Sequence, residues 1–455
     1  MSKRNLSDLL NGDADAEPGP STKQRRRSPT PSPPLPAPQT LAYPALDSPP
    51  VTTTPFQQPT QIISFSYSPE RELQFNDDAL RYLASPPPRA QLAHGYDRWV
   101  RRPERRPRID SLLRALSAGR QKQHPALASG VGAVAWRGVL TRILTAPYEE
   151  REGWEMNVMC VDGVLYFEEH LSDARLREKN DIAPRHRIQT YFGYSFESYC
   201  TSAVPSPNGG PSVNVPQAPG DPPGWGGDVD TNVQWCSVVR TKLGATRLVI
   251  GGEVDCVRGK YTGATDTFVE LKTSMAIRGP QDEARFEKKL LKFYLQSFLL
   301  GVPEILVGFR TPAGELTTTQ TFRTTELPRL VRGKKGAWDP RVCLGWGEAF
   351  LEFVKEVVGA RGQENGARKD ERETEEQNGH AQAHPDAAVW RVSFRPNTGV
   401  ELMRLDAAGV RDVERRGGEK QDEEEEEVER VGFLPRWYWE EVTGKSESKS
   451  NGEGT

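Results

Sequence analysis

This chain of 455 residues lacks any long hydrophobic stretch. No run approaches the roughly 20 apolar residues that a membrane-spanning helix needs, so we expect no membrane partner. The polar N-terminus predicts no signal peptide. Cysteine is scarce and lacks the short paired spacings of zinc sites and disulfide frameworks, which favours a reducing, intracellular compartment. The five cysteines are Cys160, Cys200, Cys236, Cys256 and Cys343.

An excess of either charge is missing as well. Lys and Arg number 60 against 63 Asp and Glu, so the net charge of −3 does not indicate nucleic-acid binding. A local basic run, Arg101–Arg108, either steers nucleic-acid phosphates or forms a surface arm. A phosphate-binding glycine loop is also missing, because the Gly-Val-Gly stretch at 130–132 is too short. Trp136, Trp154 and Trp235 either stack bases or belong to the core.

Composition divides the chain into one predicted domain and several segments with little to bury. The segments expected to be disordered are 1–59, 362–387 and 441–455, with an acidic loop at 417–429. The domain is expected to span 60–361, with a Pro/Gly-rich insertion at 204–227, and to include the strands in 388–440. Lys23–Arg27 is similar to a nuclear-import signal, although such basic runs are often merely solvated.

The most informative feature is a carboxylate–lysine motif in the middle of the chain. Two apolar-alternating stretches, 251–257 and 268–272, predict a β-hairpin whose apolar side chains point into a core. Successive side chains in a strand point to opposite faces, so charged residues two apart share a face. We therefore expect three carboxylates and one amine to converge on a single patch. These residues are Glu253 and Asp255 in the first stretch and Glu270 and Lys272 in the second.

This residue set is typical of a metal-dependent phosphodiester nuclease. Mg²⁺ and Mn²⁺ prefer carboxylate oxygens, so Asp255 and Glu270 could hold one ion while Glu253 holds or bridges a second. Such ions polarise a phosphoryl oxygen and lower the pKa of a bound water. Lys272 would help that water lose its proton and offset charge on the phosphate. The alternative is that these charges are ordinary solvated pairs across neighbouring strands.

The segment after the motif predicts a helix over Glu283–Leu300 that ends at Gly301. Lys288, Lys292 and Gln296 recur every fourth residue on it. They either form a solvated face or line the carboxylate patch, where Gln296 would orient a water or a phosphate. Two strands, Glu304–Phe309 and Thr317–Phe322, are predicted next.

The segment before the motif predicts mostly strands. A strand is expected over Val134–Leu140, and the Asp-Gly pair at 162–163 predicts a hairpin. Strands over 235–243 and 247–250 lead into the motif, and a further hairpin is expected over 390–405. Glu197 lies within the aromatic run Tyr191–Ser198. An acid among aromatic residues costs free energy unless it is paired, bound to metal, or placed at the surface.

The ordered set of motifs resembles that of the DXO-type RNA 5′-end decapping nucleases. This family also contains the activator of a nuclear 5′–3′ exoribonuclease. The resemblance extends from about residue 130 to about residue 309, and long low-complexity insertions suggest a fungal member. The matching residues are Trp136-Arg137-Gly138, Gly193-Tyr194-Ser195-Phe196-Glu197, Gly252-Glu253-Val254-Asp255, Glu270-Leu271-Lys272 and Phe293-Tyr294-Leu295-Gln296.

The resemblance implies an α+β fold similar to PD-(D/E)xK nucleases, with two packed mixed β-sheets flanked by helices. It implies one or two Mg²⁺ or Mn²⁺ ions held by Glu197, the three carboxylates of the motif and the backbone carbonyl of Leu271. Lys272 and Gln296 would position the attacking water. Arg137 would contact a substrate phosphate, and Glu197, Lys272 and Gln296 would also contact substrate.

The resemblance further implies a hydrolase that leaves 5′-monophosphate RNA for 5′–3′ decay. Its substrates would be RNA 5′ ends that carry a triphosphate, released as pyrophosphate, an incomplete guanosine cap or a NAD cap. A second hypothesis is a non-catalytic stabiliser of a nuclear 5′–3′ exoribonuclease, and a third is a DNA nuclease. A nuclear location is expected under the first two.

Overall fold

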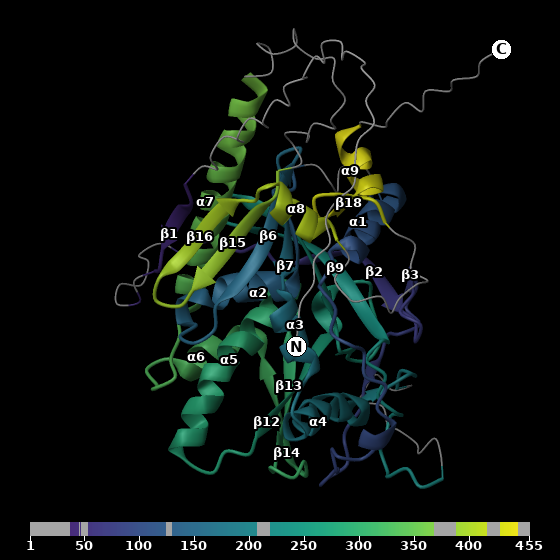
Figure 1. Cartoon of the computed structure of the whole chain (residues 1–455). Helices are drawn as coiled ribbons and strands as arrows, with labels where there is room; N and C mark the ends of the chain where they lie inside the picture. Colours follow the sequence, from purple (N-terminus) through teal and green to yellow (C-terminus); the bar gives the residue numbers. More distant parts are fainter. Residues whose placement is uncertain are drawn as a thin grey trace, which may run out of the picture. The chain divides into compact units, whose positions relative to one another are not determined.

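Strands from distant parts of the sequence form the larger of two main sheets (Figure 1). The computed structural model describes residues 37–44, 46, 53–123, 130–206, 219–367, 388–415 and 428–444, with the backbone alone at 360–367. Within these ranges the sheet mixes parallel and antiparallel neighbours. Its ten strands run in the order β1 (Gln39–Ala42), β16 (Gly399–Arg404), β15 (Trp390–Arg395), β6 (Trp154–Val161), β7 (Val164–His170), β5 (Ala133–Trp136), β10 (Thr246–Glu253), β9 (Gln234–Leu243), β2 (Thr60–Tyr67) and β3 (Leu73–Gln74).

The smaller sheet contains the second half of the carboxylate–lysine motif. Within the described ranges its six strands run in the order β14 (Leu316–Arg323), β13 (Glu304–Arg310), β12 (Phe268–Met275), β11 (Cys256–Val257), β4 (Tyr82–Leu83) and β8 (Thr201–Ser202). A short separate pair is formed by β17 (Arg430–Val431) and β18 (Leu434–Pro435). The predicted architecture of mixed sheets with flanking helices is therefore confirmed.

Helices cover both faces of the larger sheet. Leu248 and Ile250 of β10 pack toward α2, α5 and α7, whereas Val249 packs on the opposite face with α1 and α9. This alternation explains why the central strands read as nearly continuous apolar runs. The helices are α1 (Asp110–Gln123), α2 (Arg137–Thr145), α3 (Asp173–Asn180), α4 (Pro184–Cys200), α5 (Pro280–Leu300), α6 (Leu327–Val331), α7 (Pro340–Ala367), α8 (Ala407–Glu414) and α9 (Arg436–Thr443).

Most predicted turns and helix ends have the expected backbone. Asp162 and Gly163 both have positive φ angles, 49° and 74°, as a tight hairpin between β6 and β7 requires. Helix α5 starts at Pro280, three residues before the predicted start, and ends at Leu300, followed by Gly301 with a φ of 72°. Proline suits the first helical turn and glycine the left-handed end. In the part of the chain that is described, no helix is long and apolar enough to span a bilayer.

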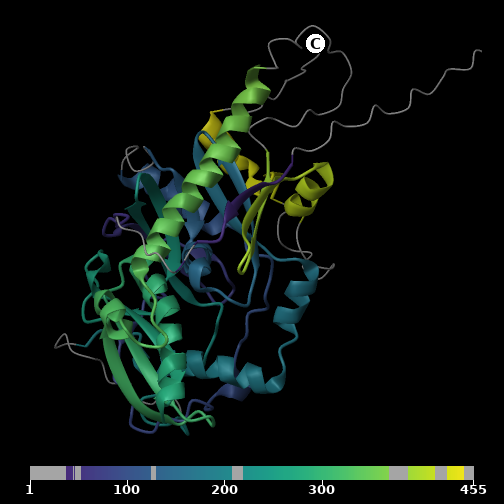
Figure 2. The same cartoon turned by 90° about the vertical axis from the view of Figure 1, so that its left-hand side faces the viewer.

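The prediction of a disordered segment over residues 1–59 is wrong at its end. Strand β1 pairs antiparallel with β16, and Leu41 lies opposite Val400 (Figures 1 and 2). Phe56 packs against Phe298 of α5, with tilted rings whose centroids lie 4.6 Å apart. The edge of the sheet supplies backbone hydrogen bonds that the composition of this segment does not reveal. Lys23–Arg27 lies outside the described residues.

Three other boundaries also differ from the predictions. Helix α7 continues to Ala367, so the charged insertion starts later than residue 362. Trp225, within the supposed insertion 204–227, is fully buried against Tyr199 of α4. Helix α9 extends to Thr443, beyond residue 440. Residues 207–218, 368–387, 416–427 and 445–455 lie outside the described ranges.

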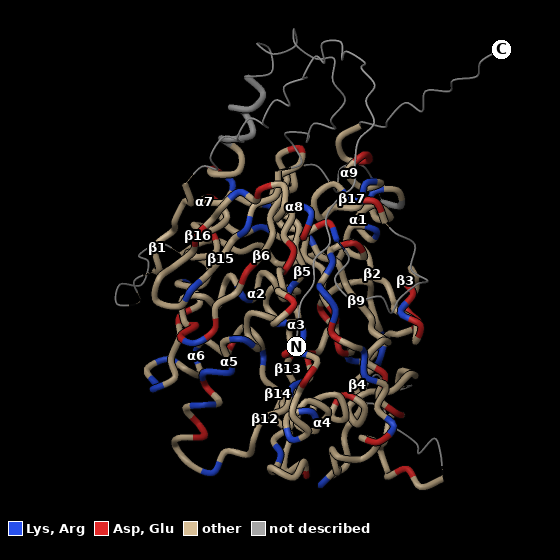
Figure 3. The backbone as a smooth tube through the Cα atoms, viewed as in Figure 1, with Lys and Arg blue, Asp and Glu red and all other residues tan. Residues whose placement is uncertain are grey.

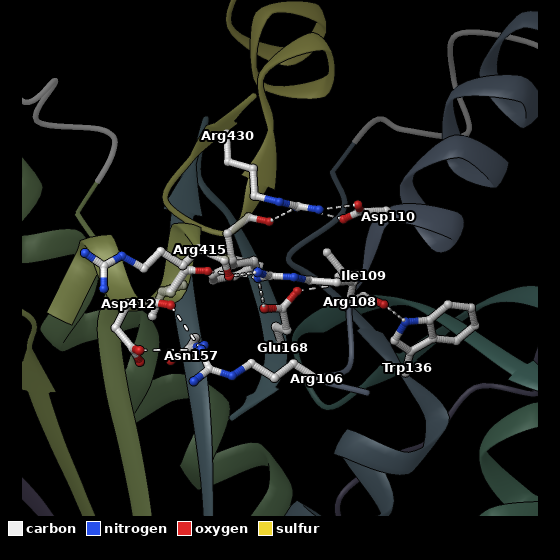
Figure 4. A network of polar contacts seen from close by, with 12 residues as sticks. Arg106, Arg108, Ile109, Asp110, Trp136, Asn157, Glu168, Asp412, Arg415 and Arg430 are labelled. Atoms are coloured by element: carbon white, nitrogen blue, oxygen red, sulfur yellow. Dashed lines mark hydrogen bonds and ion pairs between the residues drawn. The ribbon is translucent and has the colours of Figure 1, made fainter. Parts of the chain in front are cut away.

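The C-terminal end of the basic run Arg101–Arg108 contacts the rest of the protein, whereas Arg102 and Arg105 are exposed. Nη1 of Arg108 donates to Glu168 Oε1 and to the carbonyl of Val413, both at 3.0 Å (Figure 4). Its Nη2 donates to the carbonyl of Arg415 at 2.7 Å. Glu168 lies on β7 and is 3% exposed. The run therefore joins the central sheet to the end of α8.

One of the three tryptophans, Trp136, is hydrogen-bonded to the backbone of Arg108. Trp136 donates its indole N–H to the carbonyl of Arg108 at 3.0 Å (Figure 4). Trp154 and Trp235 are 7% and 2% exposed and belong to the hydrophobic core. The core alternative is therefore confirmed for these two residues.

Replacing Arg108 with Ala should lower the free energy of unfolding by about 3 kcal/mol at pH 8, because buried Glu168 loses its cation. Burial raises the pKa of Glu168 to about 7, above about 4.3 in the unfolded chain. Since protonation of Glu168 removes the unpaired charge, the loss should shrink as the pH falls through about 7. Urea unfolding at pH 8 and 5.5 measures both values, with the exposed Arg114→Ala as control. An equal loss at both pH values would contradict this explanation.

Candidate active site

The carboxylate–lysine motif lies where the chain crosses from the larger sheet to the smaller one. Strand β10 ends at Glu253, which pairs with Cys236 of β9, and β11 begins at Cys256 in the smaller sheet. Asp255 therefore lies in the link between two sheets. The prediction that one strand carries both Glu253 and Asp255 is wrong, because the strand ends between them, but the two carboxylates still belong to one cluster. The predicted hairpin is limited to the short antiparallel pair of β11 and β12.

Strand β12 places Glu270 and Lys272 as the alternation predicts. Leu271 packs with α4 residues on the opposite face, while Glu270 is fully buried. Lys272 Nζ lies 2.5 Å from Glu270 Oε1 and 3.8 Å from Asp255 Oδ2. The amine thus lies between two carboxylates supplied by different segments.

Arg137 supplies a second cation to Glu270. The strand expected over Val134–Leu140 ends at Trp136, and α2 begins at Arg137. The apolar residues that follow are spaced three and four apart, which suits a helix with one buried face. Arg137 Nη1 donates to Glu270 Oε2 at 2.8 Å. Its guanidinium is therefore directed at a protein carboxylate, and the predicted contact with a substrate phosphate stays a prediction.

Gly252 is required by the close approach of α2 and α5. A Cβ atom at this position would lie 2.8 Å from Leu300 Cδ1 and 3.0 Å from Arg137 Cβ. A larger residue would push the helix that carries Arg137 away from β10. This contact explains why the motif has glycine immediately before Glu253.

Amide groups hold the other two carboxylates of the motif. The backbone N–H of Leu271 donates to Asp255 Oδ2 at 2.6 Å. The side chain of Gln234 donates from Nε2 to Glu253 Oε2 at 2.7 Å. Gln234 was not among the predicted site residues, although the pairing register of β9 and β10 indicates it. Position 234 is the diagonal neighbour of Glu253 across the two strands.

Glu197 approaches the same cluster from α4. Helix α4 packs on β12, and Glu197 is partly buried, not fully exposed at the surface. Burial and then the charges of Asp255 and Glu253 raise its pKa well above the usual range. The pKa of Tyr194, one turn earlier, is also raised by burial and then by Glu197. The surface alternative for Glu197 is therefore wrong.

The carboxylates of the cluster divide into one strongly paired group and three under-compensated ones. Burial raises the pKa of Glu270, but Arg137 and Lys272 outweigh this effect and hold it at about 2. Burial and then Asp255 raise the pKa of Glu253 to about 7. Burial and then Glu270 raise that of Asp255 to about 6. When all four carboxylates are ionised, the two cations leave two negative charges unbalanced.

This donor set fits a hard divalent cation in chemistry and charge. Glu197, Glu253, Asp255 and Glu270 would hold it, and it would supply a Lewis acid for a phosphoryl oxygen and a water of lowered pKa. Oε1 of Glu270 is buried without a hydrogen bond of good geometry, although Lys272 is close.

The predicted metal ligands do not adopt a coordinating arrangement in this structure. Among the described residues, no three Asp, Glu, His or Cys side chains are arranged to hold a metal ion. As the side chains lie, Arg137 and Lys272 contact Glu270, and amide groups contact Asp255 and Glu253. The Leu271 contact found is through its N–H, and the role of its carbonyl stays a prediction.

Lys288, Lys292 and Gln296 on α5 were expected either to be solvated or to line the carboxylate patch, and their surroundings differ. Lys288 is exposed and lies 3.7 Å from Glu150, in agreement with a solvated face. Burial and then the charge of Arg142 lower the pKa of Lys292, with a smaller effect of Lys272. Gln296 is partly buried, and no hydrogen bond within the described ranges joins it to the carboxylates. Its role in positioning water stays a prediction.

Adding Mg²⁺ or Mn²⁺ should raise the thermal midpoint more at pH 8 than at pH 5.5. Raised carboxyl pKa values stabilise the metal-free fold at low pH, and this contribution is lost as the pH rises through 6 to 7. A cation that binds the ionised Glu253 and Asp255 raises the free energy of unfolding by about 2.7 kcal/mol when its concentration is 100 times its dissociation constant. Thermal unfolding with and without metal measures the shift, and Asp255→Asn should lose most of it. An equal shift at both pH values would contradict this expectation.

The two sheets and the carboxylate–lysine cluster at their crossing define a nuclease of the PD-(D/E)xK class. The model of the family described as RAI1 like PD-(D/E)XK nuclease matches residues 57–439. The chain belongs to this family, and it is a hydrolase.

Relatives and solved structures agree with this placement. The Mycosarcoma maydis protein named Decapping nuclease RAI1 is 35% identical over 475 residues, covering 89% of this chain and 91% of that one. The crystal structure of S. pombe Rai1 with 3′-FADP has a TM-score of 0.61 at 26% identity, covering 81% and 100%. Candida albicans Rai1 in complex with pU5-Mn²⁺ has a TM-score of 0.68 at 20% identity, covering 90% and 99%, which shows the shared fold.

Proposed function

We propose that this protein hydrolyses phosphate linkages at RNA 5′ ends and leaves 5′-monophosphate RNA. The observation that carries the proposal is a cluster of four carboxylates, one fully buried and three partly buried, with the two cations Arg137 and Lys272 beside it among the described residues. Such a cluster suits a divalent cation facing a phosphate. Decapping is the activity for which the Mycosarcoma maydis relative is named.

The proposed cofactor is one or two Mg²⁺ or Mn²⁺ ions. A bound ion would polarise the phosphoryl oxygen and lower the pKa of water. Lys272 lies beside the carboxylates as a compact positive charge that can offset charge developing on the phosphate. Arg137 keeps Glu270 ionised, and Gln296 would orient the water.

The proposed substrates are RNA 5′ ends with a triphosphate, an incomplete guanosine cap or a NAD cap. Basic and acidic residues are interspersed along α5 (Figure 3), whereas β9 and β15 carry basic residues without acidic ones. We propose that the carboxylate-bound cation recognises the terminal phosphates.

One cleavage assay tests the proposal. RNA of a single sequence with each of the three ends is incubated with Mg²⁺, Mn²⁺ or EDTA, beside DNA of the same sequence. Metal-dependent release of pyrophosphate, cap dinucleotide or NAD from RNA supports the proposal and ranks the substrates. Folded, metal-binding protein that releases none of them would contradict it, and preferential cleavage of DNA would favour a DNA nuclease.

A nuclear 5′–3′ exoribonuclease is the proposed partner, and the nucleus is the proposed location. The resemblance supports the partner, and Lys23–Arg27 supports nuclear import. An inactive variant that still stabilises the exoribonuclease would show a role independent of catalysis. A fluorescent fusion with this basic run replaced by alanine tests the location, and unchanged nuclear accumulation would contradict the assigned signal.

A further inference from the structure

A chain of three side chains leads from the turn after β2 to Glu253. Arg71 Nη1 donates to Gln234 Oε1 at 2.6 Å, and Gln234 Nε2 donates to Glu253 Oε2 at 2.7 Å. Arg71 lies between β2 and β3, Gln234 begins β9 and Glu253 ends β10. Strands β10, β9, β2 and β3 are neighbours in the larger sheet, so their backbone pairing fixes the relative positions of the three side chains. We call Arg71, Gln234 and Glu253 the relay.

The guanidinium of Arg71 is held on two further sides. Its Cζ atom lies 3.5 Å from the ring centroid of Tyr67, and Nη1 also donates to the carbonyl of Asn232 at 2.7 Å. Cation–π contact and a second acceptor restrict the orientation of the guanidinium. Arg71 therefore presents a fixed donor to Gln234.

This fixed donor decides the orientation of the Gln234 amide. A carboxamide has an oxygen that accepts and a nitrogen that donates, and arginine can only donate. The carbonyl oxygen of Gln234 must therefore face Arg71, which turns its NH₂ group toward Glu253. Without Arg71 the amide could rotate and direct its oxygen at the carboxylate.

A neutral amide suits Glu253 better than a direct cation would. Glu270 already has Arg137 at 2.8 Å and Lys272 at 2.5 Å, so its charge is compensated within the protein. The amide of Gln234 orients Glu253 while leaving its negative charge available to a cation. The relay thus separates the orientation of the carboxylate from its neutralisation.

The backbone at Arg71 indicates that its side chain has a specific use. Its φ angle is 67°, in the left-handed region, where a non-glycine residue costs roughly 1–2 kcal/mol. Glycine would remove this strain, but it would also remove the donor to Gln234. An arginine at a position suited to glycine is consistent with retention for its guanidinium.

We propose that Arg71, acting through Gln234, is a positioning residue that orients Glu253 for the divalent cation. This inference rests on the proposed function, because it assumes that the carboxylate cluster binds a cation. Partners of this kind behind a metal ligand typically contribute 10–100-fold in affinity or activity.

Calorimetric titration of Mn²⁺ into the full chain tests the relay without relying on catalysis. Arg71→Gly and Gln234→Leu should each weaken Mn²⁺ binding roughly 10-fold or more. The Mn²⁺ affinity of the double variant should equal that of the single variant with the larger loss, because both changes break the same relay. Arg71→Lys keeps a donor and should retain most of the affinity. Thermal midpoints confirm that each variant is folded.

Arg89→Gly is the matched control. Arg89 also has a positive φ angle, 59°, and its side chain pairs with Glu315 at 2.8 Å. Its replacement should leave Mn²⁺ affinity unchanged. Unchanged affinity in Arg71→Gly and Gln234→Leu, or additive losses in the double variant, would overturn the relay while the proposed function stands. Wild-type protein that binds no Mn²⁺ would overturn both.

Discussion

Asp255→Asn is expected to lower turnover by about 10³-fold or more without lowering the thermal midpoint. Asp255 lies between the two sheets, beside Lys272 and the other carboxylates of the cluster. The asparagine keeps an oxygen that accepts from the Leu271 N–H, so the local backbone contact survives. Its neutral amide is a much poorer ligand for a divalent cation.

Stability should respond in the opposite direction to activity. Burial and then the charge of Glu270 raise the pKa of Asp255 to about 6, so its ionisation at pH 8 opposes folding in the absence of a cation. Removing that charge should leave the thermal midpoint unchanged or raise it. A stabilised but inactive variant is the behaviour expected of a residue retained for function.

The control for this prediction is an acidic residue outside the cluster. Glu304→Gln removes a carboxylate on β13 that pairs with Arg258 and is partly exposed. Turnover should stay within a few-fold of wild type in this variant. Turnover in Asp255→Asn close to that of wild type would contradict the assignment, as would a fall in its thermal midpoint that accounts for the lost activity.

Arg137→Met is expected to lower the free energy of unfolding by about 3 kcal/mol at pH 7. Glu270 is fully buried, and Arg137 is one of its two cationic partners. The remaining partner, Lys272, also lies near Asp255 and cannot replace the lost hydrogen bond. Breaking a buried ion pair on one side leaves an under-compensated charge, which is the reason for the large loss.

The pH dependence of this loss follows from the pKa of Glu270. Arg137 and Lys272 outweigh burial and hold it at about 2, below about 4.3 in the unfolded chain. The stabilisation is therefore present above pH 4.3 and is lost as the pH falls toward 2. The difference between wild type and Arg137→Met should accordingly narrow in urea unfolding experiments carried out between pH 5 and pH 3.

Arg142→Met provides the comparison on the same helix. Arg142 pairs with Glu169 at 2.8 Å, but its side chain is 38% exposed, so we expect a loss below about 1 kcal/mol. Arg137→Lys should recover part of the stability but not the geometry of the guanidinium. Equal losses in Arg137→Met and Arg142→Met would show that burial of Glu270 is not the cause.

The residues that sequence patterns predicted best are those fixed by local alternation. The face shared by Glu270 and Lys272 follows from the period of one strand, and the end of α5 follows from Gly301. Both features depend on a few consecutive residues. The mixed sheets were implied by the family resemblance and are present in the structure.

The features that the sequence did not reveal depend on contacts between distant segments. The break between Glu253 and Asp255 arises because the chain changes sheets, which no local pattern marks. The predicted strand ends at Trp136, and the residues from Arg137 onward form a helix. The spacing of the apolar residues in this segment is compatible with a strand or a helix, and packing against α5 favours the helix. Gln234 and Arg71 enter the site through register across three strands.

A single-turnover reaction with 5′-triphosphate RNA and Mn²⁺ tests the central claim most directly. Wild type and Asp255→Asn are compared at equal concentration, with the RNA product examined for a 5′-monophosphate end. We predict that wild type yields 5′-monophosphate RNA and pyrophosphate, that EDTA stops the reaction, and that Asp255→Asn yields neither product on the same timescale. Equal product from folded Asp255→Asn would place the chemistry outside the carboxylate cluster and contradict the account.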